Sequence, residues 1–436
     1  MRRRLIHYAI FLPPLLLLVF GETNPSDSSY VTPINWDLYH SSDDLMEQIN
    51  SLVHRHPDKL SIEMIKSGNK GYNAEVNVVT YCRGGRDSDD RSNFRILLTF
   101  GQHGRELITS ELAFRILSIL SEEQFLPKKN GAALNSTLDK LVIKMVPIEN
   151  PNGRKRVESG DLCERRNGSH LFVSPIHGRG VDLNRNWGVD WGKKEKDYDP
   201  SEENPGTGSF SEPEAQIMRK LAISFDPHIW INVHSGMEAL FMPYDHKNIT
   251  PEGLPTQKMK TLLEKLNKFH CQNRCMIGSG GGSVGYLAHG TATDYIYDVV
   301  KAPMAFTFEI YGDNQTASRD CFKMFNPVDL PNFKRVLNDW SAAFFTIFQL
   351  GPLHLDGNSS KAADKWVSID EYLDGYLVER KNRYGKNMEV IDVGMQEIKT
   401  YFRLFMLSSV LLMFMFCSRI AKSKYSRNSI PVNVMP

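Results

Sequence analysis

The residues His103 and Glu106 stand where an apolar run at residues 96–100 ends and an amphipathic stretch begins. At the carboxyl end of a strand in an open α/β sheet, side chains face the crevice in which ligands bind. A histidine and a glutamate three residues apart, in a turn that opens a helix, can converge on one metal ion. The alternative is that both are surface polar residues of an ordinary turn.

A catalytic zinc ion takes three protein ligands of nitrogen or oxygen type and leaves a fourth position open. His234 is well placed as a third ligand, because it follows the strand-like run "IWINV" at another strand end. Other histidines are less well placed, since they lie in polar or loop-like stretches: His54, His56, His170 and His177. The His-x-x-Glu pattern alone is weak evidence for a metal.

Further polar residues lie in two other segments. The stretch "GVDLNRNW" contains Asp182, Asn184 and Arg185, and "FTFEIYG" places Glu309 inside an apolar strand. An unpaired charge is costly to bury. Glu309 is therefore either exposed on an edge strand or a general base beside a metal-bound water, with its pKa tuned by that environment.

Taken together, the ordered motifs resemble those of zinc metallocarboxypeptidases related to carboxypeptidases A and B. The matching motifs are His103-x-x-Glu106, "NPNGR" (150–154), "DLNRN", His234-Ser, Tyr286 and "FTFE". The resemblance covers about residues 35–350. It implies one zinc ion per chain, bound by His103, Glu106 and His234, with Asp182 as a partner for a zinc-bound imidazole.

The same resemblance implies roles for the remaining site residues. Glu309 would take a proton from the zinc-activated water and pass it to the leaving amine. Arg165 would stabilise the developing oxyanion, and its spacing to Asn167 favours it over Arg166. The residues on the substrate side are the clamp for the terminal carboxylate, Asn184 and Arg185, the residue that closes over the substrate, Tyr286, and an outer-subsite residue, Arg105.

Specificity depends on two positions in the pocket for the C-terminal side chain. Asp245, in "FMPYD", stands where secretory members that prefer basic residues commonly carry an acidic residue. Thr293 matches a wall position that is aspartate in the digestive B-type enzymes and apolar in the A-type ones. We therefore expect a preference for C-terminal Lys or Arg. The alternative is that Asp245 is a solvated loop residue.

The elements that must position these residues alternate between strand-like and helix-like patterns over residues 28–350. Strand-like runs occupy residues 77–81, 95–100, 141–150, 227–235 and 303–312, and helical patterns occupy residues 111–120, 212–225 and 332–350. This alternation predicts an α/β catalytic domain with a mixed, mostly parallel twisted sheet flanked by helices. The glycine cluster at residues 278–286 favours a mobile loop over a linker.

Both ends of the chain differ from the middle. Residues 1–21 read as a secretory signal peptide, with an uncleaved anchor as the alternative. Residues 351–400 are expected to form a juxtamembrane stalk, residues 401–420 a transmembrane helix, and residues 421–436 a basic cytosolic tail. A buried core helix or a processed lipid-anchor signal would also explain the apolar segment, although the basic tail argues against both.

The expected lumenal part fits a secretory route. Its glycosylation sequons are at Asn135, Asn167, Asn248, Asn314 and Asn358. One or two disulfides are expected there, and Cys271–Cys275 is locally feasible. A net charge of +1 gives no bulk electrostatic case for nucleic acid binding.

These features predict a monomeric, membrane-anchored zinc exopeptidase that acts on the C-termini of peptides or proteins, in the secretory pathway or at the cell surface. Two other classes are open. A catalytically inactive, membrane-tethered peptide-binding module should have lost a ligand or the base, yet each of those positions is filled. A zinc deacylase of small N-acyl amino acids would not need the clamp formed by Asn184, Arg185 and Tyr286.

Overall fold

The computed structural model describes residues 31–69, 71–83, 92–126, 137–169, 180–316 and 319–355. Outside these ranges lie the expected signal peptide (1–21), the stalk beyond residue 355, the membrane span (401–420) and the cytosolic tail (421–436). Within the described ranges, every helix is too short or too polar to cross a membrane. The four terminal segments therefore stay predictions from the sequence.

The strands of the described residues form one eight-stranded sheet in the order β1-β2-β4-β3-β5-β8-β6-β7. They are β1 (Leu60–Asn69), β2 (Tyr72–Cys82), β3 (Phe94–Phe100), β4 (Leu141–Val146), β5 (Ile229–His234), β6 (Met237–Met242), β7 (Met276–Ser279) and β8 (Met304–Tyr311). Pairing is parallel between β4 and β3, β3 and β5, β5 and β8, and β6 and β7, and antiparallel elsewhere. The predicted mixed sheet with a parallel centre is confirmed.

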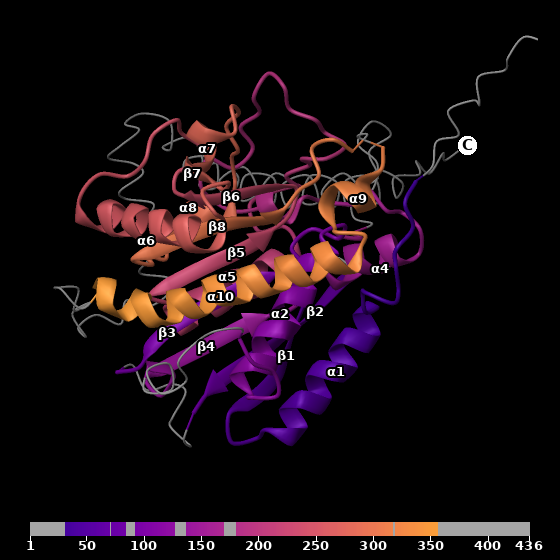
Figure 1. Cartoon of the computed structure of the whole chain (residues 1–436). Coiled ribbons are helices and arrows are strands. Elements are labelled where there is room, and N and C mark those ends of the chain that lie inside the picture. Colours follow the sequence, from indigo (N-terminus) through magenta and orange to yellow (C-terminus); the bar gives the residue numbers. More distant parts are fainter. Residues whose placement is uncertain are drawn as a thin grey trace, which may run out of the picture. The chain divides into compact units, whose positions relative to one another are not determined.

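Helices flank the sheet on both faces (Figure 1). They are α1 (Ser42–Arg55), α2 (Leu107–Leu120), α4 (Pro151–Glu158), α5 (Pro213–Phe225), α6 (Leu254–His270), α7 (Gly280–Ser283), α8 (Ala292–Asp298), α9 (Cys321–Phe325) and α10 (Leu330–Leu355), with a 3-10 turn η1 (Leu183–Arg185). On one face α10 packs against α2 and α6, and α1 packs against α2, while α5 contacts β1 and β2 on the other. α10 runs past the expected domain end at residue 350.

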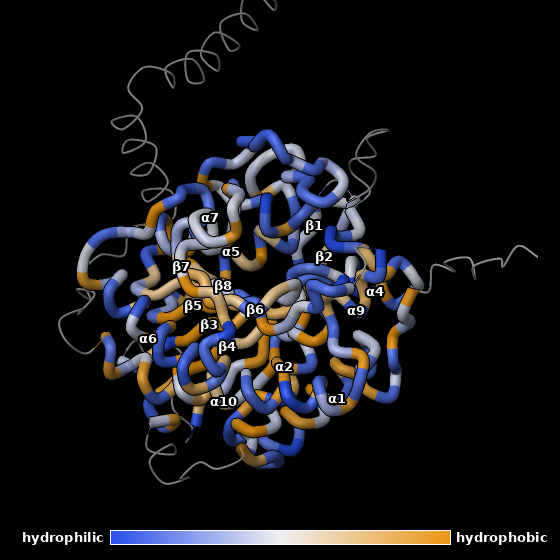
Figure 2. Tube along the Cα trace, turned by 45° about the horizontal axis from the view of Figure 1, so that its top comes forward, coloured by the Kyte–Doolittle hydropathy of each residue, from blue (hydrophilic) through white to orange (hydrophobic). Residues whose placement is uncertain are grey.

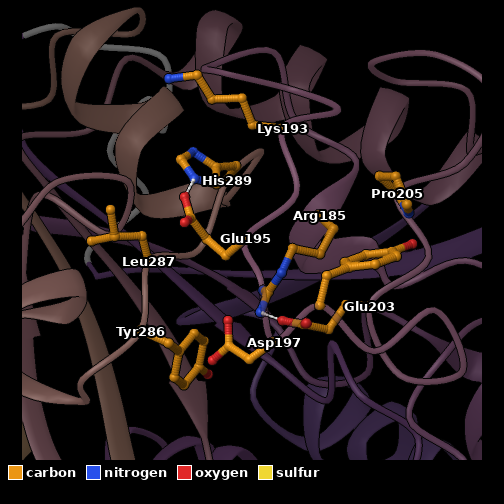
Figure 3. Close-up of a pocket in the computed structure, with 10 residues that line it drawn as sticks. Arg185, Lys193, Glu195, Asp197, Glu203, Pro205, Tyr286, Leu287 and His289 are labelled. Carbon is orange, nitrogen blue, oxygen red and sulfur yellow. Dashed lines mark hydrogen bonds and ion pairs between the residues drawn. The ribbon is translucent and has the colours of Figure 1, made fainter.

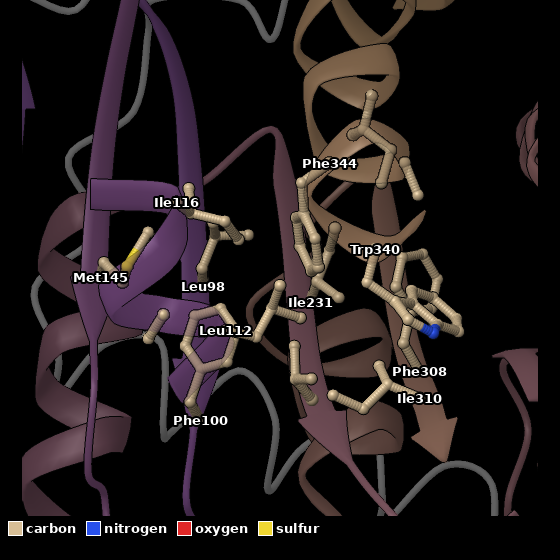
Figure 4. Close-up of a cluster of buried hydrophobic side chains, with 14 of the residues drawn as sticks. Leu98, Phe100, Leu112, Ile116, Met145, Ile231, Phe308, Ile310, Trp340 and Phe344 are labelled. Carbon is tan, nitrogen blue, oxygen red and sulfur yellow. The ribbon is translucent and has the colours of Figure 1, made fainter. Parts of the chain in front are cut away.

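The central strands are buried on both sides, which explains their continuous apolar runs. Every residue of β5 is buried. Hydrophobic segments concentrate along the sheet and the helices that pack on it (Figure 2). In the core between the strands and α10, Phe100, Ile231 and Phe308 meet Phe344 (Figure 4). This close packing fixes the carboxyl ends of β3, β5 and β8 relative to one another.

The glycine cluster at residues 278–286, which is expected to be a mobile loop, contains regular structure in its first part. Its first part ends β7 and forms the short helix α7. Gly280 is buried, and a Cβ atom built on it would lie 2.0 Å from Oδ1 of Asp245. The backbone N–H of Gly281 also donates to the carbonyl oxygen of Tyr244 at 3.0 Å. The glycines are therefore needed for close packing against the segment that carries Asp245.

Candidate active site

The three expected metal ligands converge at the carboxyl ends of two neighbouring parallel strands. His103 and Glu106 lie in the turn between β3 and α2, and His234 is the last residue of β5. Nδ1 of His103 is 2.6 Å from Oε1 of Glu106, and Nδ1 of His234 is 3.0 Å from Oε2 of Glu106. The two Nδ1 atoms are 3.1 Å apart. All three side chains are buried.

This arrangement fits a zinc ion. Ligands of a tetrahedral zinc lie roughly 3.4 Å from one another, close to the separations found here. Two imidazole nitrogens and a carboxylate that face one point form the donor set that zinc prefers. In the described part of the chain, His103, Glu106 and His234 form the one group of three histidine, cysteine or acidic residues whose side chains are close enough to hold a metal ion. In addition, Nε2 of His234 and Oε2 of Glu309 are buried without a hydrogen-bond partner there.

A glycine allows the ligand turn to reach this position. A Cβ atom on Gly104 would lie 2.6 Å from the carbonyl carbon and oxygen of Gly153, at the start of α4. Any larger residue would push the turn between His103 and Glu106 away from the "NPNG" segment. The absence of a side chain at Gly104 therefore allows the turn at residues 103–106 to pack against the "NPNG" turn.

Asp182 connects the ligand cluster to two arginines. Its Oδ1 accepts from Nε2 of His103 at 3.1 Å, and its Oδ2 accepts from Nε of Arg165 at 2.8 Å. Nη1 of Arg185 lies 3.8 Å from the same Oδ2. Although burial by itself would raise the pKa of Asp182, Arg165 and then His103 hold it well below its usual range. By contrast Arg166, the alternative to Arg165, pairs with Glu164.

Glu309 lies on an interior strand, so the edge-strand hypothesis is wrong. β8 runs between β5 and β6, and Glu309 is directly opposite His234 in the β5–β8 register. Burial, and then the nearby carboxylate of Glu106, raise the pKa of Glu309 to about 8. His103 and Arg165 act in the opposite direction. A cation held by the ligand cluster would favour the ionised carboxylate further.

The residues expected to clamp a terminal carboxylate lie beside this centre. In η1, Oδ1 of Asn184 accepts from the backbone N–H of Ala292 at 3.0 Å. The guanidinium of Arg185 donates to the carboxylate of Glu203 and, at 3.1 Å, to the carbonyl oxygen of Asn184. Arg185, Glu203 and the exposed Tyr286 line one pocket (Figure 3). Nothing in the sequence pattern signals Glu203, which lies in a loop rich in acidic residues.

The two expected specificity residues are close together and buried. Asp245 is 8% exposed, so the hypothesis of a solvated loop residue is wrong. The Thr293 hydroxyl, which shares a hydrogen bond with Thr307, also contacts the Asp245 carboxylate. Burial, and then Asp294, raise the pKa of Asp245 to about 7, and Arg185 is near enough to oppose them.

Arg105 lies at the outer side of the site. Its Nη1 donates to the carbonyl oxygen of Cys163 at 3.0 Å, and its Nη2 is 2.8 Å from Oε2 of Glu202. Its guanidinium also lies over the ring of Phe325 at 4.2 Å. Cys163 in turn forms a disulfide with Cys321, which ties the segment carrying Arg165 to α9.

One of the expected glycosylation sequons is buried in the structure, and a second disulfide is present. Asn167 is fully buried, and its amide group donates to Glu212 and Glu214, so it is not accessible for glycosylation in the folded chain. Asn248 and Asn314 are exposed. Asn135 and Asn358 lie outside the described residues. The locally feasible disulfide Cys271–Cys275 is present.

Comparisons with known proteins agree with this geometry. The profile of the zinc carboxypeptidase family matches residues 45–335, more than half of the chain. Carboxypeptidase A2 of Rattus norvegicus is 26% identical over 282 residues, which are 62% of this chain and 63% of that protein. Carboxypeptidase B2 of the same organism is 27% identical over 301 residues, 66% of each chain. The chain thus spans 63% of the length of the rat and mouse A2 relatives.

Solved structures show the same fold. Bovine thrombin-activatable fibrinolysis inhibitor, in complex with tick carboxypeptidase inhibitor, matches with a TM-score of 0.59 and 20% identity over 74% of this chain and 99% of that chain. Carboxypeptidase A of Helicoverpa armigera matches with a TM-score of 0.59 and 17% identity over 74% and 76% of the two chains. From its profile match and its fold, this chain belongs to the zinc carboxypeptidase family.

Proposed function

We propose that this chain is a zinc-dependent exopeptidase that releases the C-terminal residue of peptides or proteins, with a preference for Lys and Arg. The observation that carries the proposal is the position of Asp182. One carboxylate contacts a metal ligand, His103, and the guanidinium of Arg165, and lies 3.8 Å from Arg185. Asp182 thus joins the expected metal centre to the expected carboxylate clamp, which supports binding of a terminal carboxylate beside the metal.

Each residue has a role that its position supports. His103, Glu106 and His234 would hold zinc, which supplies a Lewis acid that polarises a peptide carbonyl and acidifies water. Glu309 would accept a proton at its carboxylate and deliver it to the leaving amine.

The neighbouring side chains would bind the substrate. Arg165 would donate to the oxygen on which negative charge develops. Asn184 and Arg185 would bind the terminal carboxylate, with Tyr286 covering it and Arg105 lining an outer subsite. The preference for basic residues follows from Asp245, because a cationic side chain would favour its ionised form in a buried pocket.

The disulfides support a secretory route for the protein. Cys163–Cys321 and Cys271–Cys275 are both present in the described residues. Disulfides form and persist in oxidising compartments and are rare in the cytosol. We propose that the catalytic domain lies in the secretory pathway or outside the cell, with residues 401–420 as the membrane anchor.

The test is turnover by the purified full chain with its zinc content measured. Matched peptides ending in Arg, Lys, Phe or amidated Arg are compared by kcat/KM. We expect release of free arginine and lysine, loss of release on amidation, and loss with a chelator. Higher kcat/KM on the Phe peptide would keep the exopeptidase and refute the basic pocket. No turnover by zinc-loaded, folded protein would refute the activity and favour a peptide-binding module.

A further inference from the structure

The guanidinium expected to bind the substrate carboxylate already has a carboxylate partner. Nη2 of Arg185 donates to Glu203, and Nη1 donates to the backbone of Asn184. Figure 3 shows this ion pair in a pocket that Tyr286 and Leu287 also line. A substrate carboxylate would bind an arginine best through two parallel N–H donors. With Glu203 in place, at least one of these donors is occupied.

Glu203 is held at this position by its own loop. Its backbone N–H donates to the carbonyl oxygen of Asp199 at 2.8 Å, and its Oε2 accepts from the Asp199 backbone N–H at 3.3 Å. The next residue, Asn204, accepts from the Asp182 backbone N–H and donates to the carbonyl oxygen of Gly180. The loop is thus attached to the segment that carries Asn184 and Arg185. Its own hydrogen bonds therefore position Glu203 to pair with Arg185.

Of the two carboxylates near Arg185, Glu203 is closer than Asp182. Asp182 is nearer to Arg165, at 2.8 Å, than to Arg185, at 3.8 Å. Arg185 is 7% exposed, so it needs a nearby anion more than a surface arginine does. The Glu203 side chain is 21% exposed, so water can solvate it when it leaves the pair. A substrate carboxylate can therefore replace Glu203 without leaving a buried charge unpaired.

We propose that Glu203 is a built-in competitor that occupies Arg185 in the free protein and is displaced by the C-terminal carboxylate of the substrate. This inference rests on the proposed function, because it assigns Arg185 to that carboxylate. Its consequence is that Glu203 weakens substrate binding by a fixed amount and leaves the chemical step unaffected. Only ligands with a carboxylate that reaches Arg185 can remove the competitor. Glu203 thereby makes binding of a free C-terminus weaker than Arg185 alone would make it.

The test compares Glu203→Gln with Glu195→Gln in the full chain. Glu195 lines the same pocket but pairs with His289, at 2.7 Å, so its variant removes the same charge without touching Arg185. Calorimetry measures binding of N-acetylarginine and of its amide to each protein. We expect Glu203→Gln to bind the carboxylate about tenfold more tightly and the amide unchanged. Glu195→Gln should bind both ligands as the wild type does.

Kinetics on an Arg-ending peptide give a second measurement. For Glu203→Gln we expect KM to fall about tenfold with kcat within about twofold of the wild type. Glu203→Ala should behave in the same way, which guards against a hydrogen bond from the new amide. A higher KM or weaker carboxylate binding in both Glu203 variants would overturn the inference and make Glu203 a positioning residue for Arg185. An equal effect of Glu195→Gln would also overturn it, as an effect of pocket charge alone.

The two proposals fail in different ways. Absence of turnover by the wild type would refute the exopeptidase, whereas the calorimetric comparison needs no turnover. Turnover by the wild type together with unchanged carboxylate binding in Glu203→Gln would refute only the competitor.

Discussion

Two sets of buried carboxylates lie near the carboxyl ends of the sheet and differ in their partners. Glu106 and Asp182 belong to the candidate metal centre, and Glu149 and Glu214 do not. All four are at most 3% exposed, so burial does not distinguish them. The first pair contacts imidazoles and, through Asp182, the guanidinium of Arg165. The second pair accepts from amide and hydroxyl groups.

The pKa values of the two sets move in opposite directions. Burial alone would raise the pKa of Glu106, but His103 and His234 hold it well below its usual range. For Glu149, burial and then Glu214 raise the pKa to about 8, and burial raises that of Glu214 to about 7. The protein therefore keeps buried carboxyl groups in two ways, either beside imidazole and guanidinium groups or with a proton.

A chain of hydrogen bonds links Glu149, of the second set, to residues that are close in sequence to His103 and His234. The Thr99 hydroxyl donates to Oδ1 of Asn232, whose amide donates to Gln102, whose amide in turn donates to Glu149, all at 2.8–2.9 Å. Gln102 precedes His103, and Asn232 lies two residues before His234 on β5. Glu149 thus supports the backbone on which His103 and His234 lie.

The largest effect is expected from removing one of the proposed zinc ligands. His234→Ala leaves one imidazole opposite Glu106, so we expect zinc content to fall from one per chain to near zero and kcat/KM to fall by at least about 10⁴-fold. Metal analysis and turnover on an Arg-ending peptide check this. The control is His54→Ala, an exposed histidine of α1 that should change neither value. Unchanged zinc stoichiometry in His234→Ala would remove that residue from the ligand set.

Glu309 combines features of the two sets of carboxylates. Burial raises its pKa, as in the second set, but it lies near Glu106 and Arg165 of the candidate metal centre. Glu309→Gln cannot accept a proton, so we expect kcat to fall about 10³-fold with zinc content unchanged. Metal analysis and kcat on the same protein sample check both parts. Retention of more than about a tenth of the activity would exclude Glu309 as the general base.

The clustering of His103, Glu106 and His234 was predictable from sequence, and the contacts of Glu203 and Glu149 were not. His103, Glu106 and His234 stand at strand ends that close packing must bring together, and Glu309 interrupts an apolar run. Glu203 and Glu149 lie in loops, where no periodicity reports which distant side chain they meet. The packing role of the α7 glycines was not predictable, because it depends on contact with Asp245, 35 residues earlier than Gly280.

A basic substrate would change the state of Asp245. Without substrate its raised pKa resembles that of the second set, and with a cationic side chain beside it the ionised form of the first set would be favoured. Asp245 is buried beside Asp294, and a cationic side chain would supply the missing counter-ion. We expect Asp245→Ala to lower kcat/KM about 30-fold on an Arg-ending peptide and less than about threefold on a Phe-ending one. The isosteric Asp245→Asn should show the same selectivity, since it removes only the charge. Equal losses on both peptides would end the pocket hypothesis.

The smallest effect on catalysis is expected in the second set, from Glu149→Gln. The amide keeps an oxygen for the hydrogen bond from Gln102 and carries no charge near Glu214. The folded-state pKa of Glu149 lies above its value of about 4.5 in the unfolded chain. Wild-type stability from this group is thus complete below about pH 4.5 and is lost as the pH rises through about 8.

Glu149→Gln should therefore gain stability over the wild type as the pH rises, by about 4 kcal/mol between pH 5 and pH 9. Denaturant unfolding at the two pH values, with zinc held constant, measures the difference. Glu75→Gln is the control, since Glu75 is exposed on β2 and its carboxylate pairs with Lys66, at 2.6 Å, rather than with a histidine. Its variant should give a difference that changes little with pH. A similarly flat difference for Glu149→Gln would mean that Glu149 is ionised in the fold and that the two sets of carboxylates are not distinct.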